Sequence, residues 1–194
     1  NKVWKEYKLF DSHAHIGSYS DIDRKANVTI IKQYMEKYNI LHCALSCLSK
    51  NIRRDNDEVA SAIRSMPDKL IGLAHIDPNL DDAADEVRRC ISMGFKGIKL
   101  HPVMDAFFAF DVRIVAPVLE AASKNHLPVL IHTGTPPMTT PIHIGYLAQN
   151  FSDIPLICAH SGLADSTYEI LSTLKIAENV YFDTALASTP PEYR

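Results

Sequence analysis

Short apolar segments alternate with helical patterns along the chain, and this alternation constrains the fold more than any other feature. The apolar segments span residues 7–15, 41–49, 70–78, 95–102, 128–134, 155–162 and 180–185. Their residues are apolar on both faces, which is typical of strands in a parallel sheet whose two sides are covered. Seven strands separated by helices predict a β/α architecture.

Six segments between these strands show helical character. They span residues 29–38, 56–65, 80–93, 112–125, 141–150 and 167–177. The clearest is 80–93, where Asn79 is a candidate cap and Gly94 follows as a stop signal. Pro117 lies inside 112–125, so we expect that this helix either starts late or kinks.

The overall composition is that of an ordinary globular domain. Of the 194 residues, 46% are hydrophobic and 22% are charged, and the net charge is −3. This balance offers no basic surface for nucleic acid or for a membrane, and no apolar run approaches the roughly 20 residues that span a bilayer. No linker or compositional break is visible, so we expect a single domain over residues 1–194.

The cysteines and the N-terminal segment bear on the cellular compartment. None of the four cysteines (Cys43, Cys47, Cys90 and Cys158) forms a Cys-x-x-Cys pair. We expect buried free thiols in a reducing cytoplasm, with metal ligation by cysteine as the alternative. The N-terminal sequence NKVWKEYKLF is charged and unlike a signal peptide, which also favours a cytoplasmic protein.

Most of the histidines fall at one end of the predicted strands. Six of the nine lie at or just past C-terminal strand ends: His13, His15, His75, His101, His132 and His160. In parallel β/α folds these ends face the functional site. The two-residue period of a strand places Asp11 on the face of His13 and His15, and Lys99 on the face of His101. Because neutral imidazole is a common ligand for transition metals, the clustering predicts a metal site.

Other polar residues near strand ends have simpler interpretations. Asp11 is either a partner of a ligating histidine or a cap of the strand end. His75 and Asp77 are candidates for the rim of a pocket, and the alternative is a turn set by Pro78. The remaining histidines are interpreted as structural or solvated: His42, His126 and His143.

Five motifs in a fixed order resemble the amidohydrolase superfamily. They are DSHAHIG, GFKGIKLHP, PVLIHTG, ICAHSG and VYFDTA. The resemblance covers essentially the whole chain and is closest to the amidohydrolase-related branch, which includes decarboxylases as well as hydrolases. It implies an α/β fold, the (β/α)₈ TIM barrel.

The chain departs from this family pattern at its C-terminal end. The family expects an Asp at the end of an eighth strand, whereas this sequence stops at ASTPPEYR soon after the seventh. Asp183, in the seventh strand, is not a registered substitute for that residue. We expect either that the natural chain continues past Arg194 or that the barrel is closed by other means.

The resemblance also implies a set of metal ligands. His13 and His15 match the first-strand ligands, and His132 matches the ligand from the fifth strand. One divalent metal is expected, with zinc favoured over manganese, iron or cobalt, and a second metal is not expected. Three ligands leave a coordination position open, which is typical of catalytic sites.

The resemblance assigns roles to three further residues. His160 matches the sixth-strand histidine that orients or polarises the hydrolytic water or the substrate. Lys99 has three interpretations: it binds a substrate carboxylate, it is a carboxylated lysine that bridges two metals, or it is a surface or rim lysine. His101 is expected to line the pocket and, with Lys99, to favour an anionic substrate.

These expectations define an enzyme and two alternatives to it. The first function is a metal-dependent hydrolase of a small, carboxylate-bearing amide, ester or lactone, in which a metal-activated water attacks the carbonyl. The alternatives are a metal-dependent decarboxylase or hydratase, and a non-catalytic metal-binding barrel. The expected partner is a small molecule. Phe107, Phe108 and Phe110 either form a lid or mediate packing in a homodimer.

Overall fold

The computed structural model describes residues 6–18, 25–47 and 51–186. The chain divides into two compact units. The N-terminal unit consists of Asn1–His75 and Arg89–Lys96, and the C-terminal unit consists of Ile76–Arg88 and Gly97–Arg194. In the described part of the chain, no helix has the length and apolar character needed to cross a membrane.

The N-terminal unit contains the first three predicted parallel strands. Strand β1 (Leu9–Ser18) pairs with β3 (Ile40–Cys47), and β3 pairs with β4 (Leu70–His75). The predicted strand 41–49 is observed as far as Cys47, and its last two residues lie outside the described ranges. A two-residue strand that the sequence pattern does not predict, β2 (Lys25–Ala26), pairs antiparallel with the end of β1.

Two helices connect these strands. Helix α1 (Val28–Tyr38) begins at Asn27, whose side-chain oxygen accepts a hydrogen bond from the backbone N–H of Ile30 at 3.0 Å. This bond satisfies one of the N–H groups that a helix leaves unpaired at its start. Helix α2 (Ile52–Ser65) starts four residues before the predicted segment and buries an apolar face that includes Val59.

Helix α3 (Ala83–Ser92) starts three residues later than predicted. Asn79 does not cap it. The Asn79 side chain instead donates hydrogen bonds to the carboxylate of Asp77 and to the carbonyl of Asp105, at 2.9 and 2.6 Å. These bonds stabilise a turn at residues 77–80, which is the turn interpretation given to this segment.

The other end of α3 follows the predicted stop signal. Gly94 adopts a φ of 98°. Its N–H donates to the carbonyl of Ile91 at 2.9 Å, and the N–H of Phe95 donates to the carbonyl of Cys90 at 3.2 Å. These two bonds define a Schellman motif, in which a glycine accepts the left-handed conformation that ends the helix.

The C-terminal unit contains the other four predicted parallel strands. They pair in chain order: β5 (Gly97–Leu100), β6 (Val129–His132), β7 (Leu156–Ala159) and β8 (Val180–Phe182). Most of their side chains are buried, as expected for a parallel sheet covered by other elements. With the three strands of the N-terminal unit, they account for all seven predicted strands.

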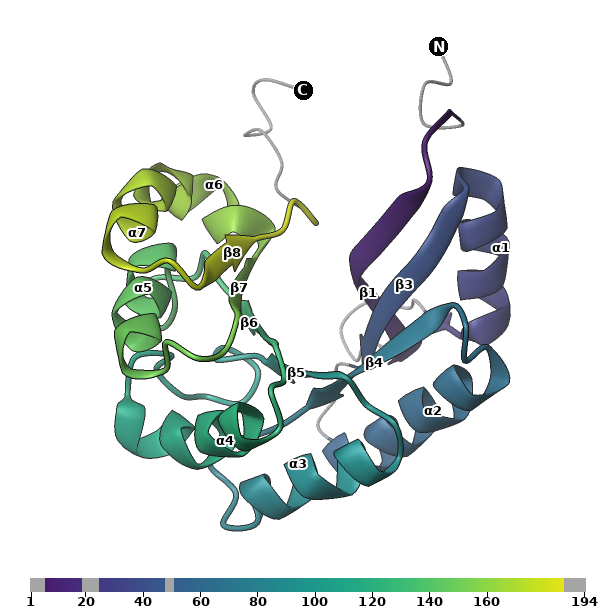
Figure 1. Ribbon diagram of the computed structural model, residues 1–194, viewed down its shortest axis with the longest axis horizontal. Helices are drawn as coiled ribbons and strands as arrows, with labels where there is room; N and C mark the ends of the chain where they lie inside the picture. The colour runs from purple at the N-terminus through teal and green to yellow at the C-terminus, as the bar shows by residue number, and fades with distance from the viewer. Residues whose placement is uncertain (1–5, 19–24, 48–50, 187–194) are drawn as a thin grey trace. The chain divides into compact units, whose positions relative to one another are not determined.

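Helices and turns join the strands of this unit. They are α4 (Val112–Lys124), α5 (Pro141–Asn150), α6 (Leu163–Ser166) and α7 (Ile170–Ile176). Helices α5 and α7 pack side by side, next to β7 and β8 (Figure 1). Helix α4 begins at Asp111, whose side chain accepts a hydrogen bond from Arg113, and it runs through Pro117, so it does not start late.

All four cysteines are free and buried, as predicted. Burial, and after it the charge of Asp11, raise the pKa of the Cys43 thiol to about 12. The ligand atoms of Cys47, Asp55 and Glu58 lie within 4.8 Å of one another, so the ligation alternative stays open for Cys47.

Two glycines with similar backbone angles but different surroundings allow backbone strain to be separated from close packing. Gly94 has a φ of 98°, and a Cβ there would meet Ile63 at 3.9 Å; Gly134 has a φ of 95°, and a Cβ there would lie 2.4 Å from the carbonyl oxygen of Gly162. Gly94→Ala should lower the free energy of unfolding by about 1–2 kcal/mol through backbone strain alone. Gly134→Ala should lower it further, because backbone atoms must also move. Urea denaturation of both variants tests this, and equal losses would contradict the close approach at Gly134.

Candidate active site

The first predicted ligand pair lies in the second half of β1 rather than at its end. His13 is buried and His15 is half-buried, and their rings make an edge-on contact with centroids 4.8 Å apart. Nδ1 of His15 lies 2.9 Å from the hydroxyl oxygen of Ser46 on the paired strand β3. Because Nδ1 is held in this bond, a metal ligated by His15 would be bound through Nε2.

Asp11 does not follow the simple alternation expected of β1. A bulge lies between Asp11 and Ala14, where one extra residue of β1 opposes β3. The Asp11 carboxylate accepts a hydrogen bond from the backbone N–H of His13 at 3.1 Å. Its charge also contributes, after burial, to the raised pKa of Tyr34 on α1. These contacts favour the interpretation of Asp11 as a cap within the strand.

His75 is more deeply buried than a rim residue. Its side chain is fully buried at the end of β4. The side chain of Asn56 accepts a hydrogen bond from the His75 N–H at 3.0 Å and donates one to the His75 carbonyl at 2.9 Å. The rim interpretation of His75 is therefore wrong.

Three imidazoles lie in sequence across the strands of the C-terminal unit. His101 directly follows β5, His132 ends β6 and His160 directly follows β7. The rings of His101 and His132 stack with centroids 4.2 Å apart and an interplanar angle of 11°. His132 and His160 meet edge-on at 5.0 Å and 70°. Parallel pairing of β5, β6 and β7 thus brings three of the predicted site residues into contact.

Hydrogen bonds orient each of these rings. Nδ1 of His101 accepts from the backbone N–H of Met104 at 3.2 Å. Nε2 of His132 lies 3.1 Å from the hydroxyl oxygen of Thr135, so a metal ligated by His132 would be bound through Nδ1. Nδ1 of His160 lies 2.6 Å from the carbonyl oxygen of Ala185. A carbonyl can only accept, so this nitrogen of His160 carries a proton.

Lys99 is completely buried within β5. Burial disfavours its ammonium form and lowers its pKa from 10.5 to about 7, and the nearby Asp183 carboxylate opposes this shift. The interpretation of Lys99 as a surface or rim lysine is therefore wrong. Substrate binding and carboxylation both remain predictions.

The residues that sequence reasoning missed are mostly partners of the predicted ones. Thr133 and Thr135 follow β6, and Ser46 faces His15. Asp183 is buried just past β8, at the strand-end position that the histidines occupy in β6 and β7. This shared strand-end position is the signal in the sequence that points to Asp183.

The aromatic residues of the loop after β5 differ in burial. Phe107 is buried, so it does not form part of an exposed interface, and the lid stays a prediction. Phe108 and Phe110 are partly exposed, with exposed fractions of 43% and 45%, and the Phe110 ring contacts His143 at 4.5 Å. The homodimer stays a prediction.

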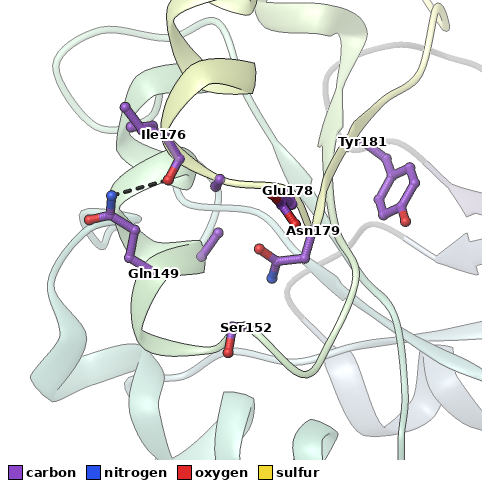
Figure 2. Close-up of a pocket in the computed structure, with 8 residues that line it drawn as sticks. Gln149, Ser152, Ile176, Glu178, Asn179 and Tyr181 are labelled. Carbon is purple, nitrogen blue, oxygen red and sulfur yellow. Dashed lines mark hydrogen bonds between the residues drawn. The ribbon is translucent and has the colours of Figure 1, made fainter.

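A cavity in the C-terminal unit lies away from these residues. It has a volume of about 400 Å³ and is lined by the ends of α5 and α7 and by the segment that enters β8. Figure 2 shows Gln149, whose side chain donates to the carbonyl of Ile176, with Asn179 and Tyr181 nearby. The cavity lies beside the segment that enters β8, whereas most of the predicted site residues lie at or just past C-terminal strand ends.

The comparison with protein families resolves the class of the chain. The amidohydrolase family model matches residues 11–194, which is nearly the whole chain. The chain belongs to the amidohydrolase family. This membership confirms the resemblance seen in the motifs and places the protein in a family of metal-dependent enzymes. No curated protein sequence matches it closely enough to count as a relative.

Solved structures show that this amidohydrolase has the TIM-barrel fold that the sequence predicts. A TIM-barrel protein from Bordetella bronchiseptica matches with a TM-score of 0.73 and 16% identity, covering 93% of this chain and 76% of the other. A probable 2-pyrone-4,6-dicarboxylic acid hydrolase from Acinetobacter baumannii, with citric acid bound, matches with a TM-score of 0.69 and 19% identity, covering 92% and 70%.

A third similar structure is that of an enzyme with a different activity. It is 5-carboxyvanillate decarboxylase from Novosphingobium aromaticivorans with bound manganese, matched with a TM-score of 0.66 and 15% identity over 80% of this chain and 66% of the other. Structures with this fold therefore include a probable hydrolase and a decarboxylase, so the fold alone leaves the reaction open.

The burial of Lys99 makes the stability of the protein depend on pH. The unfolded chain holds the Lys99 proton up to pH 10.5, whereas the folded protein releases it near pH 7. The unfolded state therefore binds more protons between these values, and stability should rise with pH across this window. Below pH 7, Lys99 is charged in both states, and the burial of its ammonium group destabilises the folded protein to the full extent.

Lys99→Met removes this titration while keeping an unbranched side chain. The free energy of unfolding of the native protein, minus that of Lys99→Met, should increase by several kcal/mol from pH 7 to 10. Urea denaturation at a series of pH values measures the difference. A difference that is flat or falls with pH would show that Lys99 does not change its proton affinity on folding.

Proposed function

We propose that the protein is a metal-dependent hydrolase that acts on a small, carboxylate-bearing amide, ester or lactone. The observation that carries the proposal is the cluster in the C-terminal unit, where three imidazoles in contact lie at adjacent strand ends and a buried lysine lies within β5. Cationic and proton-transferring groups of this kind suit the binding of an anion and the hydrolysis of a carbonyl bond. The family to which the chain belongs supports the assignment.

The metal would be held by His13, His15 and His132, as the family motifs imply. Imidazole donors fit zinc and other transition metals, whereas Ca²⁺ and Mg²⁺ prefer oxygen ligands. Nδ1 of His15 is bonded to Ser46 and Nε2 of His132 to Thr135, so each ring would offer its other nitrogen to a metal. A divalent metal bound there would supply Lewis acidity and activate water. We propose one metal per chain, with zinc favoured; the manganese bound by the decarboxylase makes that metal the first alternative.

The other residues would bind the substrate and move protons. Because Nδ1 of His160 donates to the Ala185 carbonyl, Nε2 is the nitrogen that would accept a proton or bond to a substrate oxygen. His101, which is slightly exposed, would contact the substrate carboxylate. Lys99, whose pKa is lowered to about 7, would contribute positive charge when it is protonated, in part balanced by Asp183.

A decarboxylase or hydratase is the second candidate. It is favoured by the similarity to 5-carboxyvanillate decarboxylase, an enzyme named for a substrate that carries a carboxylate. In a decarboxylase, the same cationic cluster would bind the carboxylate that is lost as CO₂. In a hydratase, it would bind a carboxylate of the substrate to which water is added. The third alternative, a non-catalytic barrel, is disfavoured by membership in an enzyme family.

Metal binding can be tested separately from catalysis. The purified protein, stripped with a chelator and then reconstituted with zinc or manganese, should bind about one equivalent, because three imidazoles form a catalytic-type site. The double variant His13→Ala, His15→Ala should retain less than about 0.2 equivalents after the same treatment. His42→Ala, an exposed histidine on β3, is the matched control and should bind like the native protein. Equal binding by the double variant would overturn the metal site.

The reaction class can be tested with a panel of carboxylate-bearing substrates. Hydrolysis of amides, esters and lactones, release of CO₂ and addition of water should be measured on the metal-loaded protein. We expect hydrolysis, and we expect His160→Gln to lower kcat by about 10²–10⁴-fold, the usual contribution of an acid–base group. His126→Gln, on an exposed histidine, is the control. CO₂ release or water addition without hydrolysis would establish the second candidate instead.

A further inference from the structure

The segment that follows β8 holds the backbone of the turn that carries His160. The Asp183 carboxylate accepts hydrogen bonds from the backbone N–H of His160 at 2.8 Å and from that of Ala185 at 2.9 Å, through the same oxygen. The carbonyl of Asp183 accepts from the hydroxyl of Ser161 at 2.5 Å. Asp183 is buried, with an exposed fraction of 6%, so these bonds are shielded from water.

The turn itself has an unusual backbone. His160, Ser161, Gly162 and Leu163 have φ values of 63°, 50°, 83° and 51°. Three of the four are not glycine, and each non-glycine residue in this region costs about 1–2 kcal/mol. Such a conformation persists only where the surroundings impose it.

The end of β6 holds the same turn from another side. The hydroxyl of Thr133 donates to the carbonyl of Ala159 at 2.6 Å and accepts from the N–H of Gly162 at 3.1 Å. Gly134 approaches Gly162 so closely that a side chain at either residue would meet a neighbour. Within the C-terminal unit, the turn is thus bonded to the segments after β6 and β8.

These contacts determine how His160 presents its ring. The Ala185 carbonyl accepts from Nδ1 of His160, and the Asp183 side chain fixes Ala185 through its N–H. Asp183 therefore supports His160 in two ways: it holds the backbone of His160, and it holds Ala185, whose carbonyl bonds to the His160 ring. Displacement of its carboxylate would release both.

We propose that Asp183 is a positioning residue that holds His160 in the Nδ1-protonated tautomer, with Nε2 as the acceptor for the reaction. This inference rests on the proposed function, since it assigns the proton-accepting atom of that site. Asp183 acts through His160 and the Ala185 carbonyl and needs no contact with the substrate.

Asp183 also lies close enough to Lys99 to oppose the lowering of its pKa. A purely electrostatic role would depend on the charge of residue 183, whereas the positioning role depends on the place of its oxygen. Asp183→Asn keeps an oxygen in place and removes the charge. Asp183→Glu keeps the charge and moves the oxygen by one methylene.

The test is the ring-nitrogen NMR spectrum of protein labelled with ¹⁵N-histidine, recorded as purified and after loading with zinc. His160→Gln assigns the signals, and Asp153→Asn, on an exposed carboxylate of the same unit, is the control. The native protein, Asp153→Asn and Asp183→Asn should show His160 protonated at Nδ1. Asp183→Glu should show a mixture of tautomers. It should also lower kcat by roughly 10²-fold, the low end of an acid–base contribution, with KM within twofold of the native value.

Two results would overturn the proposal. One is a native pattern in Asp183→Glu, and the other is loss of the pattern in Asp183→Asn, which would show that charge rather than geometry matters. Circular dichroism checks that each variant folds, and Asp183→Ala replaces the Glu variant if that variant does not. If the native protein binds no metal and has no activity, the proposed function fails, while the NMR comparison still decides the role of Asp183.

Discussion

Parallel pairing of β5 to β8 is the constraint on which the C-terminal unit depends. Neighbouring strands lie about 4.8 Å apart, so side chains that end adjacent strands are brought within contact distance. His101, His132 and His160 come from three successive strands, and their rings touch in that order. Most residues of these strands are apolar and buried, with Lys99 in β5 as the charged exception, and the pairing of the strands brings together the histidines that end or follow them.

The burial of Lys99 shows how the unit accommodates a charge inside this apolar sheet. An isolated ammonium in such a place would be strongly destabilising, and its lowered pKa records that cost. The Asp183 carboxylate reduces the cost and at the same time accepts backbone hydrogen bonds from the turn at His160. One buried carboxylate thus links the electrostatics of β5 with the backbone geometry after β7.

Much of this arrangement could be predicted from the sequence, because the strand pattern and the strand-end histidines both leave direct traces in residue type. The bulge in β1 could not be predicted, because an extra residue opposite β3 leaves no mark in residue type. It only changes the alternation of side chains between Asp11 and the residues that follow. Helix α3 starts late because Asn79 bonds to the turn instead of capping. The role of Asp183 was missed because its partners are backbone groups, which every residue carries.

Residue 185 makes its hydrogen bonds through backbone atoms alone, and this affects what sequence variation at this position can show. Ala185 contacts His160 through its carbonyl and Asp183 through its N–H, and its methyl group takes part in neither bond. Many side chains could therefore occupy this position while the atoms that matter stay in place. Scanning mutagenesis or a comparison of homologues would register residue 185 as tolerant, and only proline, which lacks the N–H, would reveal that the backbone of this position supports Asp183 and His160.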